Sequence, residues 1–156
     1  MPRAEGRVSR QPARLPQLRP EAAVLPQLFE HRLDTLEGLE FYGATDRIMA
    51  ENDGKALELE GMLLVPALEC ENVGISVEIL APGSCYPGIV FRFADFHAFE
   101  LVYAVPATSG QYDAIQYDPV FNDSNPWQLH NGPAFQKQAL VPKGEWFTLR
   151  MKLILS

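Results

Sequence analysis

A group of polar side chains in the second half of the chain could bind a ligand rich in hydroxyl groups. Arg92 and Glu100 each stand between apolar neighbours in alternating segments, so both are expected to project from one face of a sheet. Arginine supplies fixed donors, while carboxylates and amides supply acceptors, and this mixture suits the recognition of hydroxyl groups. Alternation assigns the same face to the rest of the candidate binding set: Gln116, Asp118, Gln128, His130 and Arg150.

Aromatic side chains near this set could stack on a sugar ring, and the candidates are Tyr86, Tyr112 and Trp127. Filling of the core is the more frequent role of such residues, and it is the role expected for Trp127 and Tyr117. Cross-strand Arg–Glu and Gln–Gln pairs also stabilise a solvated sheet that binds nothing. Structural pairing is therefore the alternative for the whole candidate set.

A cluster of oxygen-bearing side chains offers a weaker site for calcium. Calcium binds several carboxylate and carbonyl oxygens, and the cluster supplies them from Asp118, Asn122, Asp123 and Asn125. Asn and Asp beside proline are more often residues of a plain turn. We therefore expect no cofactor, and calcium is the metal to test.

Other catalytic chemistry finds little support in the sequence. Cys70 and Cys85 are the two cysteines, too few for a disulfide framework, and no Cys/His spacing indicates zinc. They are expected to be buried free thiols, with one disulfide as the alternative in an exported protein. There is no GxSxG elbow, phosphate loop or dinucleotide fingerprint.

Length and composition predict one globular domain after a basic arm. The chain has 156 residues, of which 47% are hydrophobic, enough for a single core. Residues 1–26 contain five arginines and two glutamates, a net charge of +3. Since the whole chain has a net charge of −7, the rest of the chain carries −10. This arm, rich in Arg and Pro, is expected to be disordered, and a single folded domain is expected to cover residues 27–156. The acidic body disfavours nucleic acid.

No apolar run reaches the length of a membrane span, and the arm lacks the apolar stretch of a secretory signal. A cytoplasmic location is the plain interpretation. Secretion is the alternative if the start of the chain has been altered.

Short alternating segments separated by turn residues predict an all-β fold. A tight turn at residues 51–54 follows a first strand, and the later strands each end at Pro, Gly, Asn or Asp. This spacing is typical of a two-sheet antiparallel β-sandwich. The expected strands after the turn cover residues 56–61, 73–80, 88–94, 98–105, 114–121, 127–130 and 145–155.

The last expected strand is strongly apolar and stands at the end of the sequence. Residues 147–155 alternate with few interruptions, and a bare strand of this kind is an exposed edge that invites pairing with another chain. We therefore expect either a domain that is incomplete at its C-terminus or self-association through this strand.

Five segments together carry a family resemblance. They read GIVFRF at residues 88–93, FELVY at 99–103, AIQYDPVFN at 114–122, WQL at 127–129 and GEWF at 144–147. In order and spacing they resemble concanavalin A-like lectin/glucanase domains, above all the laminin G-like jelly rolls that include 3-keto-disaccharide hydrolase-type domains. The resemblance covers roughly residues 40–155. It implies a jelly-roll β-sandwich that binds or cleaves carbohydrate and usually continues for several strands beyond GEWF.

The resemblance leaves three functions open. Glucanases of this superfamily carry two glutamates on one strand around an aspartate, but Glu58 with Glu60, and Glu69 with Glu71, lack that aspartate. A lectin-like module that binds a glycan through the polar sheet face is therefore favoured. A glycoside hydrolase-like enzyme acting on a di- or oligosaccharide and a protein-interaction sandwich without a sugar site are the alternatives.

Overall fold

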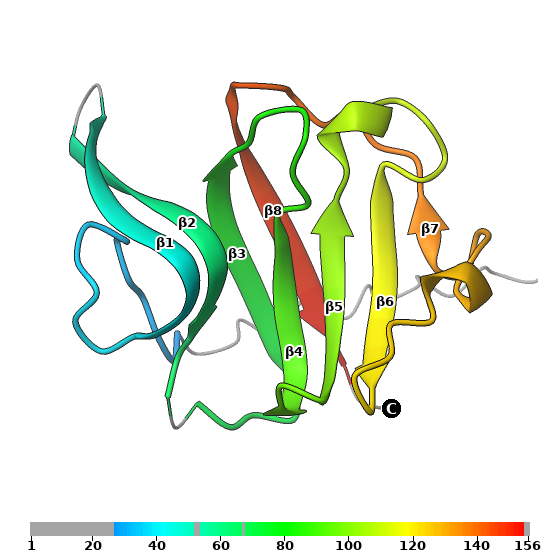
Figure 1. Ribbon diagram of the computed structural model, residues 1–156, viewed down its shortest axis with the longest axis horizontal. Coiled ribbons are helices and arrows are strands. Elements are labelled where there is room, and N and C mark those ends of the chain that lie inside the picture. The colour runs from blue at the N-terminus through cyan, green and yellow to red at the C-terminus, as the bar shows by residue number, and fades with distance from the viewer. Residues whose placement is uncertain (1–26, 52–53, 67, 155–156) are drawn as a thin grey trace, which may run out of the picture.

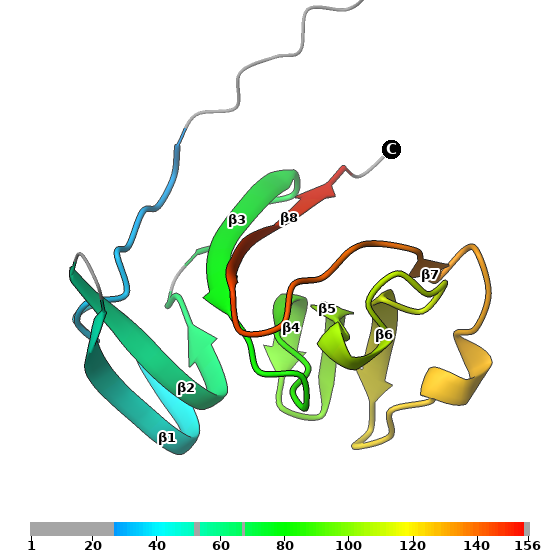
Figure 2. The same ribbon diagram turned by 90° about the horizontal axis from the view of Figure 1, so that it is seen from above.

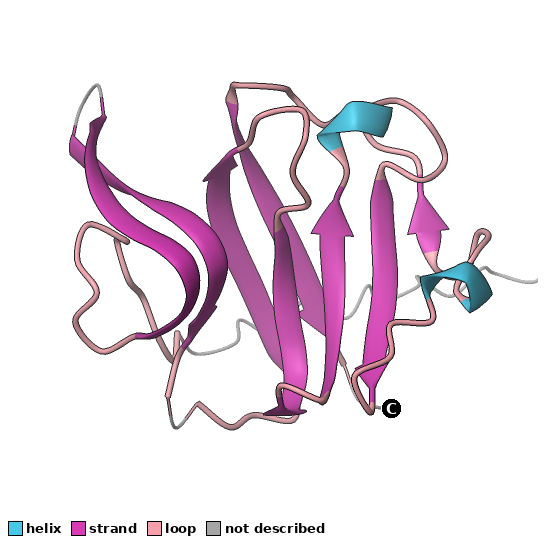
Figure 3. Ribbon diagram, in the orientation of Figure 1, coloured by secondary structure: helices cyan, strands magenta, loops and turns pink. Residues whose placement is uncertain are grey.

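The computed structural model describes residues 27–51, 54–66 and 68–154, and the arm expected over residues 1–26 lies outside them. The described chain is all-β, with antiparallel pairing throughout and two short 3₁₀ helices (Figure 3). The strands are β1 (Glu40–Glu51), β2 (Gly54–Leu64), β3 (Val73–Leu80), β4 (Gly88–Asp95), β5 (Ala98–Ala104), β6 (Ile115–Phe121), β7 (Gln136–Lys137) and β8 (Trp146–Leu153). The 3₁₀ helices are η1 (Pro106–Thr108) and η2 (Trp127–Leu129).

These strands form three sheets. The front sheet has the order β4-β5-β6-β7, the back sheet consists of β3 and β8, and β1 with β2 forms a separate hairpin. Figure 1 shows the back sheet behind the front sheet, and Figure 2 shows the two as stacked layers with the hairpin beside them. This is the antiparallel sandwich that the sequence predicts.

Strict alternation explains the back sheet. Val77 is the partner of Leu149 and Ile79 is the partner of Phe147, so one face of the sheet is apolar. On the other face Ser76 is opposite Arg150, and these side chains are exposed. One face therefore packs inward, and the other meets solvent.

The compact part of the core lies where the two sheets meet. Ala104 and Ala114 are fully buried and form a cluster with Val141. Ile115 of the front sheet and Phe147 of the back sheet pack against this cluster. Since Ala104 and Ile115 are cross-strand partners, their face of the front sheet is the one that meets β8.

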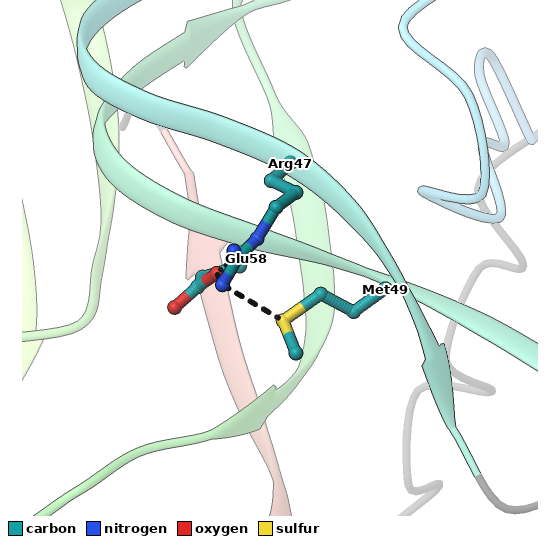
Figure 4. Close-up of polar contacts among 3 residues, drawn as sticks. All are labelled: Arg47, Met49 and Glu58. Atoms are coloured by element: carbon teal, nitrogen blue, oxygen red, sulfur yellow. Dashed lines mark hydrogen bonds and ion pairs between the residues drawn. The ribbon is translucent and has the colours of Figure 1, made fainter.

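The β1–β2 hairpin is sharply curved, and two facing glycines allow the bend. Gly43 is the partner of Gly61, and the register shifts at this point. A Cβ atom on Gly43 would lie 2.5 Å from the Cα of Gly61, so side chains are excluded there. Further along, Arg47 of β1 bonds to Glu58 of β2, with Met49 beside them (Figure 4).

Five expected strands are confirmed within about two residues at each end, and residues 56–61 lie inside β2. The strand predicted over residues 127–130 is wrong, because Trp127–Leu129 forms a 3₁₀ helix after Pro126. The expected core position of Trp127 is also wrong, since its side chain is 54% exposed. The expectation of buried thiols fails for Cys70, which is exposed, and both cysteines are free.

None of the helices in the described ranges has the length and apolar character needed to cross a membrane.

Candidate functional site

Arg92 of β4 and Glu100 of β5 form the centre of the candidate site. The Nη1 atom of Arg92 donates to both carboxylate oxygens of Glu100, at 3.0 and 3.2 Å. The Glu100 side chain is only 16% exposed, whereas Arg92 is 46% exposed. The carboxylate is thus largely enclosed, and the guanidinium group forms the boundary with solvent.

An unusual backbone conformation brings Arg92 to this position. Phe91 is the register partner of Glu100 and shares its face, so simple alternation would send Arg92 to the opposite face. Arg92 instead has φ of 47°, in the left-handed region, where the strand register is irregular. This conformation is costly for a residue with a side chain and is found disproportionately at functional sites. It re-aims the guanidinium group at Glu100.

Tyr117 of β6 supplies a third polar group. Its hydroxyl donates to Oε2 of Glu100 at 3.0 Å, so the carboxylate is held from two sides. Burial, the hydrogen bond and the negative charge of Glu100 raise the pKa of Tyr117 to about 12, although Arg92 opposes the shift. The hydroxyl therefore stays protonated and keeps donating at neutral pH.

Aromatic rings extend the site from Tyr117 toward the segment after η2. The Tyr117 ring stacks on Phe135 with centroids 6.0 Å apart, and His130 meets both rings edge-on. Nδ1 of His130 lies 3.1 Å from the carbonyl oxygen of Pro126, to which it donates. In that tautomer Nε2 is an acceptor. Phe91 contributes a further ring, 6.3 Å from Tyr117. We call this set the Glu100 cluster: Arg92, Glu100, Tyr117, His130, Phe91 and Phe135.

Gln116 and Asp118 lie on the opposite face of the front sheet. The register places Tyr103 opposite Gln116 and Leu101 opposite Asp118, while Glu100 is opposite Pro119. The expectation that Glu100 shares a face with Gln116 and Asp118, away from the core, is therefore wrong. Glu100 lies on the face of Ala104 and Ile115, which is the face that meets β8. The register between two strands decides which of their side chains share a face. Alternation within each strand does not determine that register.

The other members of the candidate set are also apart from the Glu100 cluster. Gln128 is exposed on η2, and Arg150 is exposed on the outer face of the back sheet, opposite Ser76. The structure thus brings together Arg92, Glu100 and His130 from the predicted set. Tyr117 and Phe135 were missed, Tyr117 because its alternation indicates a core role and Phe135 because it lies in none of the predicted strands.

The calcium candidates do not form one group. Asp118 is buried and accepts the hydroxyl of Tyr103 at 2.6 Å. Asp123 instead forms an ion pair with His97 at 2.5 Å. In the portion of the chain that the structure describes, no three His, Cys, Asp or Glu side chains gather closely enough to hold a metal.

A shallow depression of about 530 Å³ lies beside β7, at the edge of the front sheet. Tyr112 lines it and is 63% exposed, so this ring is available for stacking. The amide of Gln138 is held there by a 2.7 Å hydrogen bond to the carbonyl of Gly110. The lining residues are Tyr112, Gly132, Pro133, Gln136, Lys137 and Gln138. This depression is a second place where a sugar ring could lie.

Comparisons of this chain with family models, curated proteins and solved structures find no match.

Proposed function

We propose that this chain is a carbohydrate-binding module of the concanavalin A-like, laminin G-like jelly-roll kind, with the Glu100 cluster as its sugar site. The proposal rests on the Glu100 carboxylate, which is largely enclosed and accepts hydrogen bonds from Arg92 and Tyr117. The guanidinium group of Arg92 is the part of this arrangement that meets solvent. Donors and acceptors fixed in this way suit the hydroxyl groups of a sugar.

Each group would have a distinct role in binding. Within the described residues, Arg92 bonds through Nη1 alone, so its other N–H groups can donate to sugar hydroxyls. Nε2 of His130 can accept from a hydroxyl, since Nδ1 is engaged with Pro126. The rings of Phe91 and Phe135 supply apolar surface for the C–H faces of a sugar.

A glycoside hydrolase is the second candidate, and Glu100 is the residue that favours it. Hydrolysis of this class requires two carboxyl groups roughly 5–10 Å apart on one side of the substrate. Asp118 is the carboxylate on the neighbouring strand, but it projects from the opposite face and is engaged with Tyr103. Binding without cleavage therefore has the better support.

The test is retention on a glycan array with matched variants. Arg92→Ala and Glu100→Gln should reduce binding at least tenfold, about 1.4 kcal/mol, because each removes a charged hydrogen-bonding partner. Gln116→Ala lies on the opposite face and Arg150→Gln on the other sheet, so both should bind like the wild type. Runs with calcium and with a chelator test the metal separately.

Two outcomes would contradict the proposal. Unchanged retention in the Arg92 and Glu100 variants, with loss in Tyr112→Ala, would place the sugar in the depression beside β7 instead. Turnover of a chromogenic disaccharide that Glu100→Gln abolishes would identify the protein as a hydrolase.

A further inference from the structure

Met49 of β1 carries its sulfur beside a charged donor on the surface of the hairpin. Nη2 of Arg47 lies 3.8 Å from Sδ of Met49 and donates to it (Figure 4). Met49 is 41% exposed, whereas Met62 and Met151, the other methionines in the described ranges, are partly buried. Because oxidants reach accessible methionines first, Met49 is the expected site of attack among the three.

A carboxylate on the neighbouring strand fixes the guanidinium group of Arg47. Its Nε atom donates to Oε2 of Glu58 at 2.9 Å, and Nη2 donates to the same oxygen. Arg47 and Glu58 are register partners across the hairpin. Arg47 and Met49 stand two residues apart on β1, so their side chains share a face. The guanidinium group is thus held by β2 while it presents Nη2 to a sulfur of β1.

The contact with sulfur is weak, and an oxygen on that sulfur would make it strong. A thioether is a weak acceptor. A sulfoxide oxygen carries partial negative charge, and hydrogen bonds with an ionised donor are roughly twice as strong as neutral ones. An N–H···O bond spans about 2.9 Å, less than the 3.8 Å between Nη2 and Sδ. An oxygen on the side of the sulfur that faces Arg47 therefore lies within reach of the guanidinium group.

The surroundings of Met49 leave room for that oxygen. The register partner of Met49 is Ala56, whose side chain is a single methyl group. Oxidation of a methionine that packs among apolar groups disrupts the packing, but Met49 is open to solvent. Met62 is the contrasting case, since it is only partly exposed and its register partner is Tyr42. At Met49 the added oxygen gains a partner without displacing a packed side chain.

We propose that Met49 is a site of reversible oxidation by a hydroperoxide, and that Arg47 binds the sulfoxide so that oxidation strengthens the hairpin. A lone pair of Sδ attacks the distal oxygen of the peroxide, and the O–O bond breaks as the S–O bond forms. The leaving oxygen takes the hydroxyl proton and departs as water or an alcohol. The sulfur loses the two electrons that the peroxide gains. Reduction by two thiols reverses the step and yields a disulfide and water.

Hydrogen exchange of the full chain before and after treatment with hydrogen peroxide tests the proposal. Peptide mapping by mass spectrometry should find oxidation at Met49 ahead of Met62 and Met151. The amides of β1 and β2 should then exchange about fivefold more slowly than in the reduced protein, because opening of the hairpin breaks the new charged hydrogen bond. The amides of β3 and β8 are the internal reference and should be unchanged.

Two variants separate this contact from other effects of the oxidant. Arg47→Leu lacks the donor, so oxidation should not slow exchange in its hairpin. Met49→Leu lacks the sulfur, and its hairpin should not respond to peroxide. Both substitutions fall on exposed side chains, and each comparison is made within one variant. Unchanged or faster hairpin exchange in the oxidised wild type, equal slowing in Arg47→Leu, or earlier oxidation of Met62 would overturn the proposal.

Discussion

The hydroxyl of Tyr103 donates to Oδ2 of Asp118 at 2.6 Å, and Asp118 is 1% exposed. A buried carboxylate is costly unless it is hydrogen-bonded, so this contact compensates for placing a charge inside the sheet. Burial and the hydrogen bond to Asp118 raise the pKa of Tyr103. The pair is a structural element of the face opposite the Glu100 cluster.

Replacement of Tyr103 by Phe removes the donor and leaves the carboxylate of Asp118 buried. We expect a loss of about 1–3 kcal/mol in the free energy of unfolding, measured by urea denaturation. Tyr86→Phe is the control, because Tyr86 is 72% exposed and contacts Tyr103 only through ring edges. Equal stability of Y103F and the wild type would show that Asp118 does not depend on this bond.

Tyr117 should make stability depend on pH in the alkaline range. The ordinary pKa of tyrosine is about 10, and in the folded protein that of Tyr117 is raised to about 12. The folded state therefore favours the protonated phenol. The resulting contribution to the free energy of unfolding is complete below pH of about 10 and is lost as pH rises through about 12. Tyr117→Phe should lack this loss. Parallel alkaline unfolding profiles of the two proteins would contradict the assignment.

His97 should titrate above its usual range. Its hydrogen bond to Asp123, and secondarily the charge of that aspartate, raise the pKa of His97. The stabilisation by the pair is thus present below the ordinary value of about 6.5 and lost as pH rises through the raised pKa. NMR titration of the His97 ring measures the shift. Asp123→Asn should lower the pKa, and an unmoved titration midpoint would exclude the pair in solution.

A side chain at Gly43 should disturb the hairpin. The new Cβ atom of Gly43→Ala would press on the backbone of Glu60 and Gly61, and backbone atoms cannot turn aside. We expect a loss of about 1–3 kcal/mol in thermal or denaturant unfolding. Gly74→Ala in β3 is the matched control, because a Cβ atom there meets nothing within 4 Å. Equal effects of the two substitutions would rule out the close approach.

The strand boundaries could be predicted because their determinants are local. Alternation and turn residues such as the Pro that follows β5 are visible in a single segment, and β3 occupies its predicted residues 73–80. The segment at residues 127–130 misled the prediction, because two apolar residues separated by one polar residue also fit a single 3₁₀ turn. Short patterns do not distinguish these structures.

The candidate site could be predicted only in part, because it depends on relations between strands. Glu100 and Gln116 both alternate as expected, yet the register between β5 and β6 sends them to opposite faces. The left-handed conformation of Arg92 has no sequence signal, since glycine is the residue that usually marks it. The sequence predicts that Arg92 and Glu100 share a face, but in the observed register alternation alone would place them on opposite faces. They meet because Arg92 adopts a left-handed conformation.

The β1–β2 hairpin has a consequence for how the molecule opens. In the described ranges its two strands pair only with each other, and an edge-on contact between Tyr42 and Phe96, at 4.7 Å, joins it to the β4–β5 turn. An element attached in this way can unfold as a separate cooperative unit. Its amide hydrogens should therefore exchange with solvent sooner than those of β5 and β6, and Phe96→Ala should accelerate that exchange further.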